Sequence, residues 1–212
     1  MFWSVFAATE CKQAKVCVQL KKMMSDTKQQ YISLIKKRSE ENEISLKLLF
    51  NENLFGNCVS ILRQELDSFI RIMYLGRISD FIERERLMAQ TLAGEKWTTL
   101  TVKNKWKPIT DSDMVKIANE LEGYVQYVYN FGCSFIHLSD FHNYKQNNPF
   151  SKLDEFDQYD ISFYLEQYHG LPMDTELTIE NISYLIPAIF DKISTNMSCY
   201  FSKILNDEMI ES

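Results

Sequence analysis

The densest group of chemically competent side chains in this 212-residue chain lies in the stretch YNFGCSFIHLSDFHNY, residues 129–144. On a continuous helix Cys133, His137 and Asp140 would share one face, because four and three residues separate them. A thiol, an imidazole and an orienting carboxylate are the groups of a nucleophilic cysteine site. His137 and His142 are five residues apart and diverge by roughly 140° around a helix axis. That spacing argues against a helical two-histidine metal site, and we predict no metal and no cofactor.

The same stretch has a structural interpretation. Gly132 falls on an apolar stripe, where the missing side chain lets a partner helix approach closely. Cys133 lies among aromatic residues, where a free cysteine usually packs as a small hydrophobe. His137 or Asp140 can be a hydrogen-bonded polar group in the core. Three residues near the expected helix end are the more accessible to a ligand: His142, Asn143 and Tyr144.

A second polar concentration is ILRQELDSFIRIMY, in which Arg63, Asp67 and Arg71 recur at intervals of four. Such residues form a ladder along one side of a helix, which is usually a solvated salt-bridge face. Arg63 and Asp67, however, directly follow residues of an apolar stripe. Buried charge is costly unless it is paired, so a specific network facing the histidine-bearing helix is the alternative. The candidate catalytic residues are therefore His137, His142 and Arg63, and the candidate binding residues are Asp67, Arg71, Asp140, Asn143 and Tyr144.

The elements that carry these residues are predicted to be helices. The strongest apolar stripe alternates steps of three and four residues, at Val59, Leu62, Leu66, Phe69 and Met73. The first two predicted helices cover residues 5–37, with a second piece capped by Ser25, and residues 40–78, with a bend at NENLFGN. The next two cover residues 79–92, capped by Ser79, and residues 110–135, capped by Thr110. A short helix ends at Gly170, and the last helix covers residues 178–205 and restarts at Pro187. Because no strand alternation interrupts them, we predict an all-α helical bundle of five or more helices.

One segment breaks the helical period. The sequence AGEKWTTLTVKNKWKPI, residues 93–109, contains three threonines, two tryptophans, a glycine and a proline. We predict a long loop or a short extended piece here. A long loop in a compact domain tends to be functional or to cover an edge of the core.

Charge is distributed unevenly along the chain. Residues 10–38 carry eight Lys/Arg against two acids, a net charge of +6, whereas residues 151–212 carry three against twelve, a net charge of -9. We predict that residues 1–40 are a basic helical arm and residues 41–212 the bundle domain. We favour pairing of the arm with the acidic end of its own chain or of a second subunit over binding of nucleic acid, and we predict a homodimer.

Cysteine usage and hydropathy exclude other classes of protein. The five cysteines are scattered and form no CxxC pair, which argues against a disulfide framework and a structural zinc site. This usage suits a reducing compartment, and we predict a cytoplasmic protein. No apolar run approaches the length that spans a bilayer, so we predict no membrane association.

The phrases LRQELDSFIRIMYL and YNFGCSFIHLSDFHNY, with DKIS near the C-terminus, resemble a group of uncharacterised bacterial proteins over residues 45–205. The architecture is more distantly similar to the HEPN superfamily of helical bundles, many of which are ribonucleases of defence systems. The ribonuclease motif of that superfamily places an arginine about five to seven residues before the histidine. His137 matches the histidine, but residues 129–132 contain no arginine, so the resemblance implies that Arg63 would have to supply the charge.

These observations predict a bacterial HEPN-like module that binds RNA, a nucleotide or a partner protein in defence or stress response. One alternative is a metal-independent RNase that uses His137 with Arg63. Another is a purely structural interaction protein in which the dense stretch belongs to the core.

Overall fold

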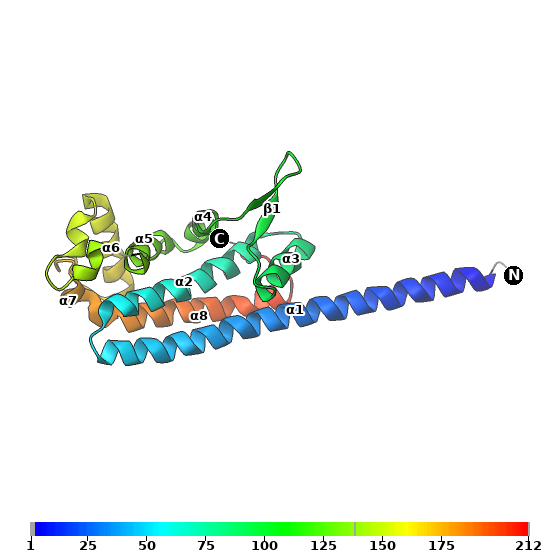
Figure 1. Cartoon of the computed structure of the whole chain (residues 1–212), viewed down its shortest axis with the longest axis horizontal. Helices are drawn as coiled ribbons and strands as arrows, with labels where there is room; N and C mark the ends of the chain where they lie inside the picture. The colour runs from blue at the N-terminus through cyan, green and yellow to red at the C-terminus, as the bar shows by residue number, and fades with distance from the viewer. Residues whose placement is uncertain (1–2, 138, 212) are drawn as a thin grey trace.

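The predicted all-α bundle is confirmed by the computed structural model (Figure 1). The structure describes the backbone of residues 3–137 and 139–211, and it describes side chains from residue 26 onward except at positions 138, 140 and 212. The α-helices are α1 (Trp3–Asn51), α2 (Phe55–Arg77), α3 (Phe81–Leu92), α4 (Asp111–Leu121), α5 (Val125–Ile136), α6 (Glu155–His169), α7 (Ile179–Ile182) and α8 (Ile186–Leu205). Short 3-10 turns cover Asp140–Asn143, Pro149–Lys152 and Ser183–Leu185.

Helix α2 is the centre of the bundle and packs against α1, α4, α5 and α8. Its predicted stripe is the core, since Leu66, Phe69 and Met73 are completely buried. Helix α8 lies beside it and contributes Ile193 and Met197, which are also completely buried. Apolar residues at alternating three and four steps thus place one face of each helix in a shared interior.

Helix α1 is longer than predicted. The sequence predicted a second piece at Ser25 and a new helix near residue 40, but one helix runs through both positions and ends at Asn51. Its buried residues, among them Ile32, Ile35 and Leu46, continue one stripe across residue 40. The blue half of α1 extends well beyond the other helices (Figure 1).

An ion pair joins the basic segment to the acidic end of the chain. The Lys28 ammonium lies 2.5 Å from an oxygen of Asp207. Next to this pair the C-terminal segment returns to α2, where the Ile210 amide donates to the Gly76 carbonyl over 2.9 Å.

Two helix boundaries differ from prediction. The stripe expected to continue over residues 110–135 is interrupted after α4, where Glu122 adopts φ −136 and ψ 72 and the chain restarts as α5. Asp80 caps α3 in place of Ser79, because its side chain accepts from the Ile82 amide. The Thr110 cap is confirmed and forms a reciprocal capping box with Asp113.

The segment of broken helical period is a hairpin. Strands β1 (Thr98–Leu100) and β2 (Trp106–Pro108) pair antiparallel, with Leu100 opposite Trp106. Asn104 in the turn has φ 53, which asparagine tolerates better than most residues. The hairpin projects away from the helices between α3 and α4 (Figure 1).

The predicted boundaries near the C-terminus are confirmed. Helix α6 ends at Gly170, whose φ of 70 is the left-handed conformation that glycine adopts without a steric penalty. Pro187 lies in the first turn of α8, where its missing N–H costs no helical hydrogen bond.

Candidate functional site

Arg63, Asp67 and Arg71 form a paired network at the junction of α1, α2 and α4. Arg38 of α1 donates to Asp67 over 3.0 Å, and Arg71 donates to the same carboxylate oxygen over 3.4 Å. Arg63 donates over 3.3 Å to Asp111, the first residue of α4, which also lies 4.0 Å from Arg71. The ladder along α2 is therefore not a solvated face. The side chain of Arg63 is only 6% exposed, and positive and negative groups alternate through the network.

This network favours the charged forms of Asp67 and Arg63. Burial by itself would raise the pKa of Asp67, but Arg71 and Arg38 outweigh it and the pKa lies below the ordinary value. Burial likewise disfavours the charged guanidinium of Arg63, yet Cys133 and Asp67 beside it raise its pKa. Both shifts favour the charged forms of Asp67 and Arg63.

Arg63 lies directly against α5. Its guanidinium carbon is 4.0 Å from the centre of the Tyr129 ring, a cation–π contact. A Cβ added to Gly132 would lie 2.7 Å from the Cβ of Arg63, so the predicted close approach at this glycine occurs on Arg63. The Nε of Arg63 is buried and has no hydrogen-bond partner within the described part of the chain. Helix α5 therefore presents Tyr129, Gly132 and Cys133 to Arg63.

The two histidines do not join this network. Helix α5 ends at Ile136, and His137 follows it as an exposed residue in extended conformation. Its ring makes no hydrogen bond, ion pair or aromatic contact with any side chain that the structure describes. His142 is exposed and its Nδ1 lies 3.2 Å from the carbonyl of Ser139. His137 is therefore no core residue, and neither histidine contacts Arg63.

The remaining predicted binding residues lie with the histidines. Asn143 is exposed and donates to Gln146 over 3.2 Å, while Tyr144 packs its half-buried ring 6.0 Å from that of Phe135. Asp140 begins a 3-10 turn beyond α5, and its side chain lies outside the described residues. Because the helix ends before His137, the expected common helical face of Cys133, His137 and Asp140 does not form.

What the network does is position α4 and the base of the hairpin. Arg71 lies over the ring of Trp97, 5.0 Å from its centre, just before β1. Trp97 is buried and donates its indole N–H to Thr91 over 2.7 Å. Asp111 fixes the first turn of α4, directly after β2. The predicted residues Arg63, Asp67 and Arg71 thus form the support of a neighbouring surface.

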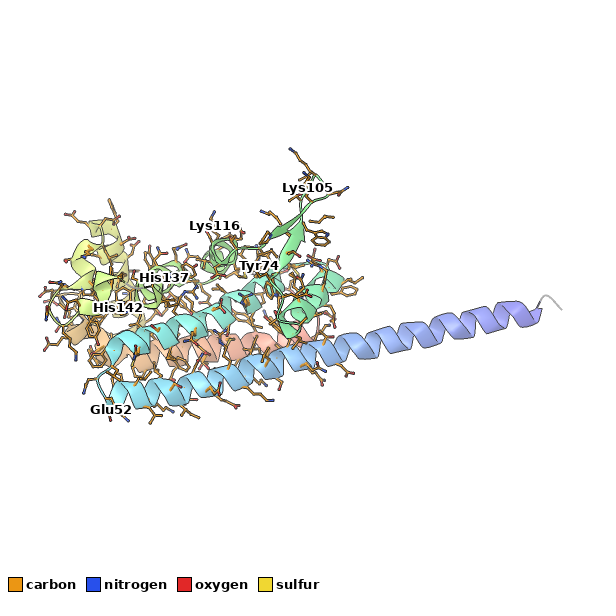
Figure 2. All side chains as sticks on the ribbon, in the orientation of Figure 1. Glu52, Tyr74, Lys105, Lys116, His137 and His142 are labelled. Carbon is orange, nitrogen blue, oxygen red and sulfur yellow. The ribbon has the colours of Figure 1, made fainter. Side chains whose placement is uncertain are left out.

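That surface, which we call the hairpin face, consists of Lys103, Lys105, Trp106 and Lys107 on the hairpin and Lys116 on α4. All five side chains are exposed, and Trp106 is 59% exposed. Lys107 and Lys116 both act on Asp113: hydrogen bonds from Thr110 lower its pKa most, and the two ammonium groups lower it further. Figure 2 shows Lys105 at the tip of the hairpin and Lys116 on the same side of the molecule.

The hairpin face was not among the predicted site residues, although the sequence contains its signal. Three lysines and a tryptophan lie within the five residues from Lys103 to Lys107, and no acidic residue lies among them. The prediction of a long loop or a short extended piece did not single out this cluster as a site.

No protein-family model, curated protein or solved structure matches this chain. Within the described residues no cluster of histidine, cysteine, aspartate or glutamate could hold a metal ion. Over the same residues, no helix combines the length and apolar character that crossing a membrane requires.

Proposed function

We propose that this chain is a helical module that binds RNA through the hairpin face. The observation that carries the proposal is the projecting hairpin, in which exposed lysines surround an exposed tryptophan. From Lys96 to Thr110 the sequence has four lysines and no carboxylate. In the described structure none of these lysines forms an ion pair with the protein's own acids, so their charge is available to a partner.

The two kinds of side chain supply two different interactions. Lysine ammonium groups neutralise backbone phosphates, which provides affinity that depends steeply on salt. An exposed tryptophan ring stacks on an unpaired base, which is worth about 1–3 kcal/mol per base. Arg86 lies 4.7 Å from the centre of the Trp106 ring and also binds the carbonyl of Thr98, so it holds that ring in place. Single-stranded RNA offers both phosphates and accessible bases.

The test is RNA binding followed by fluorescence anisotropy with a labelled 20-nucleotide oligouridine. We expect K103Q/K105Q to weaken binding at least tenfold and to reduce the slope of log K against log salt by about 1.4, since each contact contributes about 0.7 for single strands. The matched control is K47Q/K145Q, which removes two exposed lysines away from the hairpin and outside the basic segment of residues 10–38. Equal weakening by both pairs would show attraction by overall charge alone and would contradict the proposal.

Trp106→Ala separates stacking from charge. We expect at least a fivefold loss of affinity for oligouridine with an unchanged salt slope, because the substitution removes no charge. If this variant binds as the unsubstituted protein does, the hairpin face holds no base. Selective binding of anionic vesicles without RNA binding would assign the face to a membrane surface and would also overturn the proposal.

The membership in a bacterial HEPN-like defence or stress group stays a prediction from resemblance. The homodimer also stays a prediction. The alternative of a metal-independent RNase that uses His137 with Arg63 has no support from side-chain contacts, because Arg63 is committed to Asp111 and Tyr129. We therefore propose binding, and do not assign a reaction.

A further inference from the structure

We infer that a second site, a cleft between α5 and α6, binds an organic cation of the alkylammonium class. The cleft has a volume of about 350 Å³, within the range of small-molecule sites. The residues that carry the argument are Glu122, Tyr124, Tyr127, Asp160, Tyr164 and Tyr168. The cleft shares no residue with the hairpin face, so this inference does not depend on the proposed RNA binding.

The lining of the cleft is negatively charged. Asp160 and Glu122 both face it, and no lysine, arginine or histidine is among the lining residues. The Tyr127 hydroxyl donates to Oδ2 of Asp160, and the Tyr200 hydroxyl donates to Oε1 of Glu122 over 3.2 Å. Neither carboxylate forms an ion pair in the described part of the molecule. Each therefore keeps an oxygen that can face a ligand, and two carboxylates in one cleft favour a positively charged ligand.

Stacked aromatic rings form the wall of the cleft. The rings of Tyr124 and Tyr164 are stacked with their centres 5.1 Å apart, and Tyr168 follows at 5.1 Å from Tyr164. Ring faces carry partial negative charge and attract a cation within about 6 Å. Such a wall favours a cation with an apolar body over a strongly hydrated metal ion.

The protein's own Lys192 shows which charge these rings accept. Its ammonium nitrogen lies 3.5 Å from the centre of the Tyr168 ring, and 5.6 and 5.8 Å from the centres of Tyr124 and Tyr164. Lys192 is not among the residues that line the cleft, so its ammonium group contacts these rings from outside the cleft. An alkylammonium is thus already bound by this group of rings, and a second one in the cleft would lie between the rings and the two carboxylates.

The experiment compares choline with 3,3-dimethylbutan-1-ol, which has the same shape without the charge, by isothermal titration calorimetry on the full chain. We expect choline to bind and the neutral alcohol to bind at least tenfold more weakly. Trimethyl-lysine amide is titrated in parallel. Tighter binding of the amino acid than of choline assigns the cleft to a lysine side chain of a partner, and the reverse assigns it to a free small cation. Equal binding of choline and the alcohol would overturn the inference.

Three variants locate the binding. Asp160→Asn, which keeps the shape of the side chain, should weaken choline at least fivefold, and Lys192→Met should strengthen it because a repelling charge is removed. Tyr184→Ala removes a tyrosine outside the cleft that is 57% exposed, close to the 60% of Tyr168 in the cleft. This control should not change choline binding. Choline binding that is unaffected by Asp160→Asn and by Lys192→Met, with unchanged circular dichroism, would place the ligand elsewhere. The oligouridine assay on the same variants should be unchanged, so this inference and the proposed function fail separately.

Discussion

Gly132→Ala tests the close approach of α2 and α5 that positions Arg63. The added Cβ would lie 2.7 Å from the Cβ of Arg63, 3.0 Å from its Cδ and 3.1 Å from its Cγ. Carbon atoms pack best at about 3.5–4.0 Å. The two helices must therefore separate by roughly 0.8 Å or more, and the Arg63 guanidinium must move relative to Tyr129.

Two opposing terms determine the effect on stability. Replacing a mid-helix glycine by alanine gains about 0.5–1 kcal/mol from reduced backbone entropy. Overpacking a well-packed interface costs about 1–3 kcal/mol. Because the nearest atom is a Cβ, which cannot rotate away as the end of a long side chain can, we expect the packing cost to dominate. The free energy of unfolding should fall by about 1–2 kcal/mol.

The assay is urea unfolding followed by circular dichroism at 222 nm. With a slope m of about 3 kcal/mol/M, that loss lowers the unfolding midpoint by roughly 0.3–0.7 M. Gly123→Ala, in the turn between α4 and α5, is the control without a steric clash, because its added Cβ would meet no atom within 4 Å. Adding Arg63→Ala should not rescue Gly132→Ala, since alanine keeps the offending Cβ. A Gly132→Ala protein as stable as the unsubstituted one would refute the close-packing argument.

Further substitutions test other parts of the molecule. Asp67, whose pKa the arginines Arg38 and Arg71 hold below the ordinary 3.8, stabilises the fold above that pH, and its contribution is lost as the pH falls through the lowered value. Asp67→Asn should therefore be less stable at pH 7, with a urea midpoint that changes less between about pH 5 and pH 3. Val128→Ile adds one methylene beside an apolar cavity of about 70 Å³ and should add about 0.5–1 kcal/mol to the free energy of unfolding, measured as a higher melting temperature. His137→Ala should change the free energy of unfolding by less than about 0.5 kcal/mol, because the ring is exposed; a larger loss measured in urea would show contacts that contradict its placement.

The features that sequence predicts well here are local ones. The apolar stripe of α2, the Thr110 cap, the stop at Gly170 and the restart at Pro187 each depend on a few neighbouring residues, and each is confirmed. Gly132 was also predicted correctly, because a glycine on an apolar stripe has few explanations other than close packing.

The features that sequence misses depend on residues far apart in the chain. Glu65 is completely buried, and it is tolerated because Ser39 and Asn42 of α1 donate to its two oxygens over 2.5 and 2.9 Å. No pattern within the sequence of α2 predicts that Ser39 and Asn42 are the partners of Glu65. The continuity of α1 has a similar origin, because packing on α2 and α8 outweighs the weak local signals for a break near residue 25 and residue 40.

The candidate site was predicted only in part, because some of its residues come from distant parts of the chain. The spacing of Arg63, Asp67 and Arg71 indicated a network, but its outer members Arg38 and Asp111 come from α1 and α4. The histidines looked central because they are rare residues placed close together, yet α5 ends before them. Periodicity predicts which face of a helix is buried, and it predicts much less well where that helix stops.

The buried charges of α2 fix the position of the neighbouring helix α4. Replacing a buried ion pair with apolar residues is often neutral or stabilising, so pairing alone does not explain charges in the centre of a bundle. Helix α4 has 11 residues and would be marginal in isolation. An apolar contact would let so short a helix slide or rotate, whereas Asp111 can meet Arg63 and Arg71 in only one arrangement. Because β2 leads directly into α4, fixing that helix also fixes the direction of the hairpin. The network of α2 would therefore affect the proposed RNA binding only through the position of the hairpin face, without touching RNA.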